Sequence, residues 1–463
     1  MAEVLLLERN KPEGRLKVDL KARAEKESQA PTALAVLRGR NFRLRLVGGT
    51  ISSLGDQFYL IALPWLVLQL TGNAFAMGTV LALAGVPRAL FMLVGGALSD
   101  RFSPRSIMIV SNLIRMVLVG LLAAMVLAGS IQFWMLYAFA LLFGLADAFF
   151  YPAVNAILPQ IVSKEQLGIG NAIFQGAIQV SLFLGPVLAG ALIATLDGGA
   201  QAGAAGTATD REGIGLAFAI NSVTFAISVV TLWLMRIPAT QGTATTGPRQ
   251  GLLASIREGL ISVWSDEVLR TFFVMVAAVN FLVNGPFIVG IPVLADSRFV
   301  EGAAAYGAIM SAWGGGSLVG IVLAGILPKP TSRQMSLRLL LVTGVMGVGL
   351  ALTGLASTTL IAAAVGLAMG AAGGYVMIVF ITWLQARTPQ AMLGRVMSLL
   401  MFAAVGLMPV SVALAGALVD WSITATFLGA GALLLVLVSW GALNPALRAM
   451  DMDAGEAASE SAA

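Results

Sequence analysis

The sequence contains neither cysteine nor histidine, and only 11% of its 463 residues are charged. Without cysteine the chain has no disulfide and no thiol nucleophile, and without histidine it has no Ser-His-Asp triad and no HExxH zinc site. No lysine follows a glycine, so the GK[ST] segment of a phosphate-binding P-loop is missing too. These absences exclude most familiar enzymes, and we expect a protein that is not an enzyme and uses neither a cofactor nor a metal.

Hydrophobic side chains, in contrast, make up 58% of the residues. From Phe42 onward, apolar stretches of about 20 to 28 residues recur between short polar segments, which is typical of membrane-spanning helices. We therefore predict an all-α integral membrane protein with twelve transmembrane helices. The predicted spans are residues 43–70, 75–98, 106–128, 132–156, 166–195, 213–235, 268–294, 303–327, 335–356, 359–385, 393–419 and 422–444.

The loop charges predict the topology. Nearly all Lys and Arg residues between the spans fall on one side, and the other side has only Arg211 and Arg298. Because cytoplasmic loops retain positive charge, we expect both termini in the cytoplasm and the spans in the plasma or inner membrane. The basic residues are spread over many short loops, which argues against a nucleic-acid surface. We expect the lipid bilayer as the main partner and a monomeric chain.

The chain divides into two halves. We predict six-helix halves at 38–236 and 267–446, joined by a cytoplasmic linker at 237–266 that contains an interfacial helix. Polar cytoplasmic tails are predicted at 1–37 and 447–463.

The halves share a sequence pattern at a fixed offset. In the fifth span Leu167-Gly168 precedes Leu188–Leu192, and in the eleventh span Leu393-Gly394 precedes Leu414–Leu418 with the same spacing. A parallel duplication places such a match at the same position of each half. The pattern favours two pseudo-symmetric halves.

Four ionisable residues lie at membrane depth: Asp56, Arg88, Arg115 and Asp147, the last in the cytoplasmic third of its predicted span. A charge at this depth is costly and is kept for pairing or for function. The two acids and two bases could form a pair of structural ion pairs. Alternatively, Asp56 or, as a second choice, Asp147 carries protons, with an arginine tuning the carboxyl. Both hypotheses remain open at this point.

The segment between the second and third predicted spans reads GALSDRFSPR and runs from Gly96 to Arg105. It resembles motif A of the major facilitator superfamily, GxxxDRxGRR, with Ser-Pro in place of the family's Gly and first basic residue. The resemblance implies that Asp100 belongs to a charge relay that closes a cytoplasmic gate, with Arg101 and Arg105 nearby. Arg395, at the start of the eleventh span, is a candidate partner for Asp100.

The fifth predicted span contains Gly176, Gly185, Pro186 and Gly190. Proline lacks an amide and glycine lacks a side chain, so such a helix bends and packs closely against neighbours. The segment resembles motif C, GPxxGG, which marks exporters in the same superfamily, although one extra residue separates Pro186 from Gly190. Ordinary helix packing is the alternative explanation.

Taken together with the segments around Asp56 and Asp147, these motifs resemble the drug:proton antiporter branch of that superfamily, which includes the enterobactin exporter and macrolide efflux proteins. The resemblance implies a twelve-helix major facilitator fold. It also implies secondary active export of a hydrophobic or amphipathic small molecule, a drug or a siderophore, in exchange for protons by alternating access. An importer or facilitator of the same fold, or a membrane sensor or scaffold that does not transport, are the alternatives.

In that superfamily the first, fourth, seventh and tenth spans line the transport path. The resemblance therefore implies that polar and aromatic residues of these spans surround the substrate, namely Gln57, Trp65, Phe149, Asn155, Asn280, Phe281, Asn284, Tyr375, Thr382 and Trp383.

Overall fold

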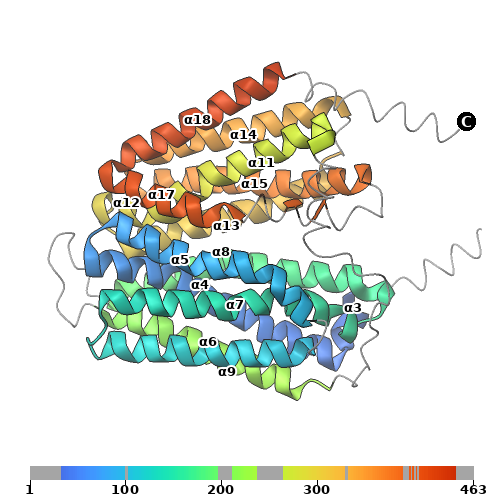
Figure 1. The fold of residues 1–463 in the computed structure, drawn as a ribbon, viewed down its shortest axis with the longest axis vertical. Helices are drawn as coiled ribbons and strands as arrows, with labels where there is room; N and C mark the ends of the chain where they lie inside the picture. Colours follow the sequence, from blue (N-terminus) through green and yellow to red (C-terminus); the bar gives the residue numbers. More distant parts are fainter. Residues whose placement is uncertain are drawn as a thin grey trace, which may run out of the picture.

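The computed structural model describes residues 33–99, 103–196, 211–236, 264–328, 332–388, 396–397, 399–400, 403 and 406–444. All regular secondary structure in these ranges is helical. Figure 1 shows two bundles packed side by side, with α3 to α9 in one and α11 to α18 in the other. Of the predicted linker only residues 264–266 are described, of the predicted N-terminal tail only residues 33–37, and the predicted C-terminal tail lies outside the described residues.

The N-terminal bundle consists of α3 (Ala33–Arg38), α4 (Arg40–Thr71), α5 (Ala74–Ser99), α6 (Pro104–Leu127), α7 (Phe133–Ile161), the short η1 (Lys164–Gln166), α8 (Leu167–Leu196) and α9 (Glu212–Leu234). The C-terminal bundle consists of α11 (Glu267–Gly285), the π-helical η3 (Pro286–Gly290), α12 (Ile291–Arg298), α13 (Ala303–Ile326), α14 (Ser332–Leu355), α15 (Thr359–Arg387), α17 (Met408–Trp421) and α18 (Ile423–Leu443). Ten described helical segments are long and apolar enough to cross a membrane.

Two predicted boundaries were wrong. The fourth span continues to Ile161 rather than ending at residue 156, because Pro152 and Pro159 lie inside α7 without ending it. Asp147 is therefore midway along α7, not in the cytoplasmic third of the span. The seventh span is not one α-helix, since the π-helical Pro286–Gly290 separates α11 from α12. Transmembrane helices tolerate such interruptions where neighbouring helices satisfy the backbone.

The two bundles meet along α8 and α13, where small residues allow the backbones to touch. A Cβ on Gly190 would lie 2.9 Å from the Cα of Gly307, and a Cβ on Gly307 would lie 3.0 Å from the Cα of Gly190. Close backbone approach of this kind is how helices associate in a membrane, where no hydrophobic effect drives them together. This glycine contact therefore fixes the distance between the two halves.

We call this contact between α8 and α13 the α8–α13 seam, and polar contacts around Pro186 add to it. Proline has no N–H, so the carbonyl of Leu182, four residues earlier, lacks its usual helical donor. That carbonyl faces Gly314 of α13. One residue after the proline, the N–H of Val187 donates to the Ser311 hydroxyl of α13 at 2.8 Å. The kink thus turns backbone groups of α8 toward the opposite half.

A second seam joins α5 to α17. A Cβ on Gly78 would lie 2.8 Å from the carbonyl oxygen of Val412 and 2.9 Å from the Cα of Gly416. Farther along α5, a Cβ on Gly85 would lie 2.9 Å from the ring of Pro409. Both inter-half seams therefore depend on glycine.

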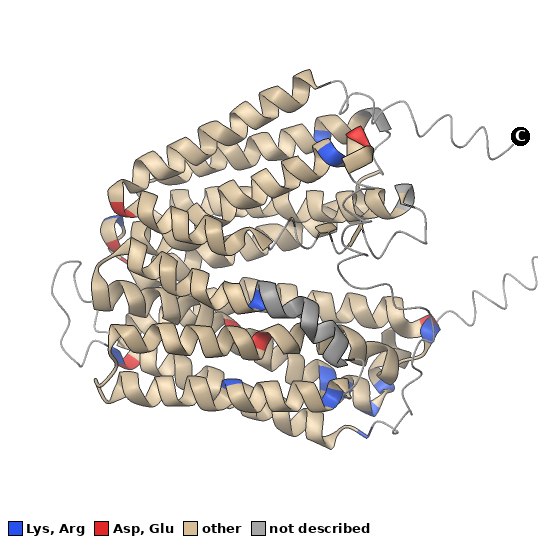
Figure 2. Cartoon of the chain, in the orientation of Figure 1, with Lys and Arg blue, Asp and Glu red and all other residues tan. Residues whose placement is uncertain are grey.

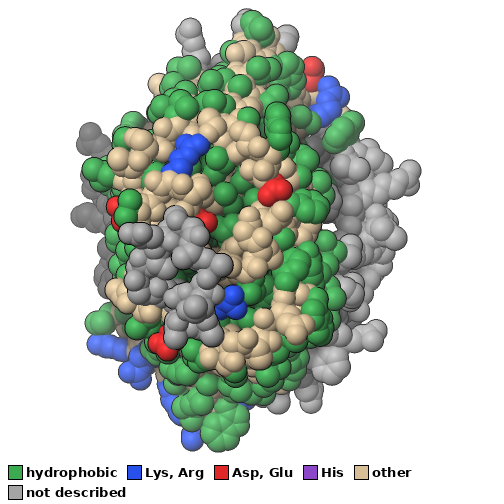
Figure 3. All heavy atoms as spheres, turned by 90° about the vertical axis from the view of Figure 1, so that its left-hand side faces the viewer, with side chains coloured by type: hydrophobic (Ala, Val, Ile, Leu, Met, Phe, Trp, Pro, Cys, Tyr) green, Lys and Arg blue, Asp and Glu red, His purple; other side chains and the backbone are tan. Residues whose placement is uncertain are grey.

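At one end of the bundle, polar side chains also connect the halves. Asp420 of α17 accepts from the N–H of Ala74 at 3.3 Å and from the Asn73 amide at 3.4 Å, which places a carboxylate at the N-terminus of α5. Gln69 donates to Asp296 at 3.1 Å. We call this the joined end; the loop charges predict that it is the external one. Viewed from this side, the surface is largely hydrophobic with few charged groups (Figure 3).

Replacing Gly307 with alanine should destabilise the protein by about 1–3 kcal/mol, because the new methyl group would press against the backbone of α8. Gly176→Ala is the matched control, since no atom of the described residues lies within 4 Å of its added methyl group and alanine favours a helix by about 1 kcal/mol. Thermal unfolding in detergent should show a lower midpoint for the first variant and an equal or higher one for the second. Equal losses in both would contradict the glycine seam.

Candidate functional site

Three helices of the N-terminal half bring charged side chains together inside the bundle, near the middle of its length. Asp147 of α7 binds Arg88 of α5 with 2.6 Å between Oδ2 and Nη2, and Arg115 of α6 with 3.2 Å between Oδ1 and Nη1. Asp147 is 5% exposed and Arg115 is 1% exposed. Figure 2 shows charged residues inside the N-terminal bundle, whereas those drawn on the C-terminal bundle gather near its ends. One carboxylate thus holds two guanidinium groups.

Arg115 is enclosed on all sides that the structure describes. Its Nη2 donates to the amide oxygen of Asn112, and the Asn112 amide donates to the Ser228 hydroxyl at 2.9 Å. The guanidinium also lies 3.9 Å from the ring centroid of Phe150 and 4.6 Å from that of Phe225. Cation–π contacts of a desolvated arginine are stabilising, so these neighbours fix the position of Arg115.

Arg88 is held less firmly. Its side chain is 30% exposed, compared with 2% for that of Arg115, and its guanidinium lies 6.0 Å from the ring centroid of Tyr151. Glycine brings its helix close enough to reach Asp147, because a Cβ on Gly144 would lie 3.0 Å from the carbonyl carbon of Ala84. Ala84 and Gly144 lie one turn before Arg88 and Asp147 on their respective helices.

Asp56, midway along α4, is near this cluster but forms no ion pair in the structure. Its buried Oδ1 has no hydrogen-bond partner among the described residues, and the charges that act on it are those of Arg115, Asp147 and Arg88. The hydroxyl of Tyr59, one turn along α4, is also buried and without a described partner. The structure has two ion pairs, but both are formed by Asp147 and neither by Asp56.

This arrangement gives the two carboxyl groups different chemical capacities. Asp147 is paired with two cations, so removing its charge would leave both arginines without this acceptor. Asp56 has an oxygen that is free to hold a proton or accept a new hydrogen bond. A buried polar atom without a partner costs about 1–3 kcal/mol, so a native protein retains one where it has a use.

Most of the predicted cytoplasmic gate cannot be placed. Asp100, Arg101 and Arg395 lie outside the described residues, and Gly96 lies within α5 where the surroundings are not described. Arg105 is described, and it binds backbone carbonyls at the end of α9: its Nε donates to the Leu232 carbonyl at 2.8 Å and its Nη2 to the Trp233 carbonyl at 2.6 Å. A cation is favourable at a helix C-terminus, which accounts for this contact.

The antiporter-like motif serves two different interfaces. Gly185 packs within the N-terminal half, where its Cβ would lie 2.5 Å from the Cγ of Gln57. Pro186 and Gly190 face α13 in the other half, as described above. Within the part of the chain that the structure describes, no atom lies within 4 Å of the Cβ position of Gly176, which belongs to neither contact.

The family model of the Major Facilitator Superfamily matches residues 46–413. The chain belongs to the Major Facilitator Superfamily. It is 26% identical over 429 residues to the multidrug efflux pump Tap of Mycolicibacterium fortuitum, covering 88% of this chain and 97% of that one. It is 22% identical over 312 residues to macrolide efflux protein A of Streptococcus pyogenes, covering 66% of this chain and 71% of that one.

Solved structures show the same fold. A variant of the nucleoside transporter NupG superposes with a TM-score of 0.66 at 12% sequence identity, covering 88% of this chain and 99% of that one. Family and fold together establish a multi-pass membrane transporter rather than an enzyme, as predicted. The predicted all-α architecture is confirmed.

Two residues predicted to line the transport path of this facilitator are packed instead. Trp65 is 6% exposed and stacks on Tyr306 of α13 with 6.5 Å between ring centroids. The Tyr306 hydroxyl donates to the Leu60 carbonyl at 3.3 Å, so this contact supports the joined end. Gln57 is buried against Gly185 of α8.

The predicted residues of α15 face neighbouring helices or their own backbone. The Tyr375 hydroxyl accepts from Arg338 of α14. The ring of Trp383 lies 5.8 Å from that of Phe272 of α11. The Thr382 hydroxyl donates to the Ile378 carbonyl one turn earlier, at 2.8 Å.

The remaining predicted residues lie on α7 and α11. On α11 the amide of Asn284 donates to the Asn280 side chain at 3.3 Å, and the amide of Asn280 donates to the Val276 carbonyl at 2.9 Å. On α7, Phe149 is half-buried and Asn155 is exposed. Phe281 lines a cavity of about 280 Å³ between α11, α17 and α18.

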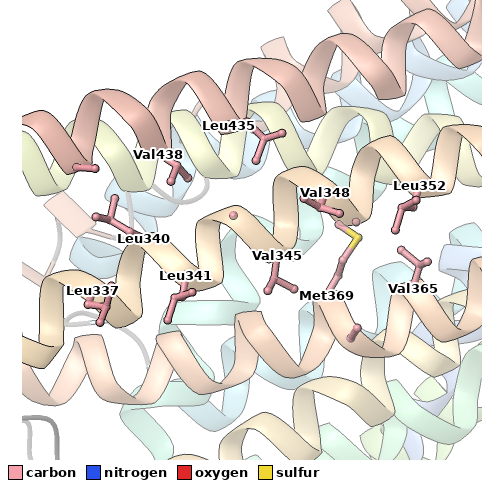
Figure 4. A pocket seen from close by; sticks show the side chains of 14 residues that line it. Leu337, Leu340, Leu341, Val345, Val348, Leu352, Val365, Met369, Leu435 and Val438 are labelled. Atoms are coloured by element: carbon pink, nitrogen blue, oxygen red, sulfur yellow. The ribbon is translucent and has the colours of Figure 1, made fainter.

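A larger apolar cavity, of about 610 Å³, lies between α14, α15 and α18. Figure 4 shows Leu341, Val345, Met369 and Leu435 among the aliphatic side chains that line it. Neither cavity includes the charged cluster of Asp56, Arg88, Arg115 and Asp147, so the two cavities carry no information on proton coupling.

Sequence reasoning missed the residues that hold Arg115. Asn112 could have been found, because it lies three residues before Arg115 and therefore on the same helix face. Ser228 has no such signal, since only packing brings α9 beside α6. Arg45 was not among the predicted site residues, yet it is 8% exposed within α4 and its guanidinium lies 5.1 Å from the ring centroid of Phe174.

Removing Arg115 should cost more stability than removing Arg88. Arg115→Ala would empty the space between two aromatic rings and leave Asn112 and one oxygen of Asp147 unsatisfied, with an expected loss of about 3–5 kcal/mol. Arg88→Ala should lose about 1 kcal/mol, because that side chain is 30% exposed and Asp147 would keep its ion pair with Arg115. Arg270→Ala, at the start of α11, is the control for loss of an arginine. The order of thermal midpoints in detergent tests this, and an equal loss for both cluster variants would contradict it.

Proposed function

We propose that this facilitator exports hydrophobic or amphipathic small molecules, either drugs or a siderophore, in exchange for protons by alternating access. Two relatives that match most of the chain are named as a multidrug efflux pump and a macrolide efflux protein, which supports export of drug-like compounds. The observation that carries the proton coupling is the buried, unpartnered Oδ1 of Asp56 beside a cluster in which the other carboxylate is already paired.

The charges of the cluster allow Asp56 to exist in both protonation states. Arg88 and Arg115 outweigh Asp147 by one positive charge, and this excess favours an ionised Asp56. Burial opposes ionisation because it removes the carboxylate from water. Since the two effects act in opposite directions, a change of solvent access during transport can decide whether Asp56 binds or releases a proton.

The inter-half contacts fit a rocking motion. The seams α8–α13 and α5–α17 are built on glycine contacts and a few hydrogen bonds rather than on interlocked side chains. The polar contacts of Asp420 and Asp296 at the joined end can form and break with little cost, because they are partly exposed. With that end external, the described conformation is closed toward the outside, and opening there would complete the cycle.

The rest of the proposal follows the loop charges and composition. Both termini lie in the cytoplasm, the proton gradient is the energy source, no cofactor is required, and the chain works as a monomer. The cytoplasmic relay of Asp100 with Arg101 and Arg395 is part of the proposal.

The two alternative functions predict different dye movements. Cells that express an importer would take up dye, and cells that express a non-transporting scaffold would neither take up nor export dye.

Asp56→Asn should abolish dye transport driven by an imposed pH gradient in proteoliposomes, because asparagine cannot exchange a proton. Exchange of labelled for unlabelled dye at equal pH should persist, since it needs no net proton movement. Ethidium and Nile red are suitable probes, and Glu212→Gln at the start of α9 is the control for loss of an acid.

Undiminished pH-driven transport by Asp56→Asn would contradict the role of Asp56. Absence of any pH-driven export by the unaltered protein, with either dye or with siderophores, would contradict proton-coupled export itself.

A further inference from the structure

The two arginines on Asp147 differ in freedom of movement. Arg115 is enclosed by Asn112 and two aromatic rings and its side chain is 2% exposed, whereas the side chain of Arg88 is 30% exposed. If Arg88 left Asp147, the carboxylate would still have Arg115 at 3.2 Å. Asp147 can therefore release one arginine without becoming an unpaired buried charge, which would be strongly destabilising.

Asp56 is the other acceptor available to Arg88. Its Oδ1 is buried and unpartnered, and Arg88 is among the charges that act on it. The ionisable groups that face Asp56 are Arg88 on α5, Arg115 on α6 and Asp147 on α7. Tyr59 on its own helix and Tyr151 on α7 complete the set. Of the other helices packed on α4, α8 has no charged residue within its bounds and α9 has one at its first position.

The helix that carries Arg88 also forms an inter-half seam. Gly85, one turn before Arg88, packs against Pro409 of α17, and Gly78 packs against Gly416. A shift of α5 that follows Arg88 would therefore alter the contact between the two halves. The helices of Arg115 and Asp147 make their principal contacts within the N-terminal half.

We propose that Arg88 moves its ion pair from Asp147 to Asp56 when Asp56 releases its proton, and that this movement transmits the protonation state to the α5–α17 seam. The inference rests on the proposed role of Asp56 as proton carrier. The proton leaves Asp56 for water, Arg88 stays charged throughout, and no bond other than that O–H is broken.

Every charge has a partner in both states. With Asp56 protonated, Asp147 holds both arginines, as the structure shows. With Asp56 ionised, Arg88 pairs with Asp56 and Arg115 stays with Asp147, which gives two separate pairs. Asn112 and Ser228 act as positioning residues, because they keep Arg115 on Asp147 while Arg88 moves.

A single introduced thiol can report the state of the seam. The chain has no cysteine, so Val412→Cys would add the sole thiol. Val412 is 2% exposed, and its backbone lies against Gly78. In lipid nanodiscs, both faces are open to a hydrophilic maleimide, and its reaction rate measures how often the seam opens. We expect this rate to change severalfold between acidic and alkaline pH.

Substitutions of the two acids should hold the maleimide reaction rate at opposite limits. Asp56→Asn imitates the protonated acid and should hold the rate at its low-pH value at every pH. Asp147→Asn should release Arg88 to Asp56 and hold the rate at its high-pH value. A purely structural role of these residues would not give opposite plateaus.

Arg88→Ala should remove the pH dependence while downhill dye movement continues, and Arg88→Lys should restore part of it because the cation is regained. Arg270→Ala is the control and should keep the full dependence. Suppose that Arg88→Ala and Arg88→Lys both keep the pH dependence of the labelling rate and that Asp56→Asn abolishes it. The proposed movement of Arg88 would then be contradicted, and Asp56 would remain the proton carrier. If Asp56→Asn also keeps the pH dependence, the proposed function fails as well.

Discussion

A charge buried in the membrane interior must have a partner, and this constraint organises the N-terminal half. Asp147 draws α5, α6 and α7 together because two arginines from different helices end on one carboxylate. The close contact of Gly144 with Ala84 and the aromatic rings around Arg115 make that geometry possible. The described C-terminal helices hold no comparable cluster at mid-height, so the chemistry of the two halves differs although their helices correspond.

The contact between the halves follows the opposite principle. At α8–α13 and α5–α17 the contact positions are glycines, which have no side chain. The backbones therefore touch directly, at Gly190 with Gly307 and at Gly78 with Gly416. Contacts of this kind are close, but few side chains would have to repack if the two helices slid past each other. The ion pairs of Asp147 thus lie within one half, whereas the contacts between the halves depend on the absence of side chains.

The linear pattern of apolar runs was enough to place nearly all helix ends within a few residues, because a spanning helix must be about 20 residues long wherever it lies. It failed at α7, which continues to Ile161, and at α11, where the π-helical segment was not foreseen. The four buried charges were also visible in the sequence, since charges are rare at membrane depth. Their pairing was not, because helix rotation decides which residues meet.

The residues predicted to line the substrate cavity show the same limit of sequence-based prediction, since helix rotation decides what they contact. Trp65, Gln57, Tyr375 and Trp383 were selected for being polar or aromatic in the expected spans, yet the structure has each of them packed against another helix or hydrogen-bonded to it. By itself, the sequence determined that the chain spans a membrane, that it belongs with the facilitators by its motifs, and which ionisable groups lie in the interior. Only the tertiary structure decided that Asp147 holds both arginines while Asp56 keeps a free oxygen, because that outcome depends on distances between helices far apart in the chain.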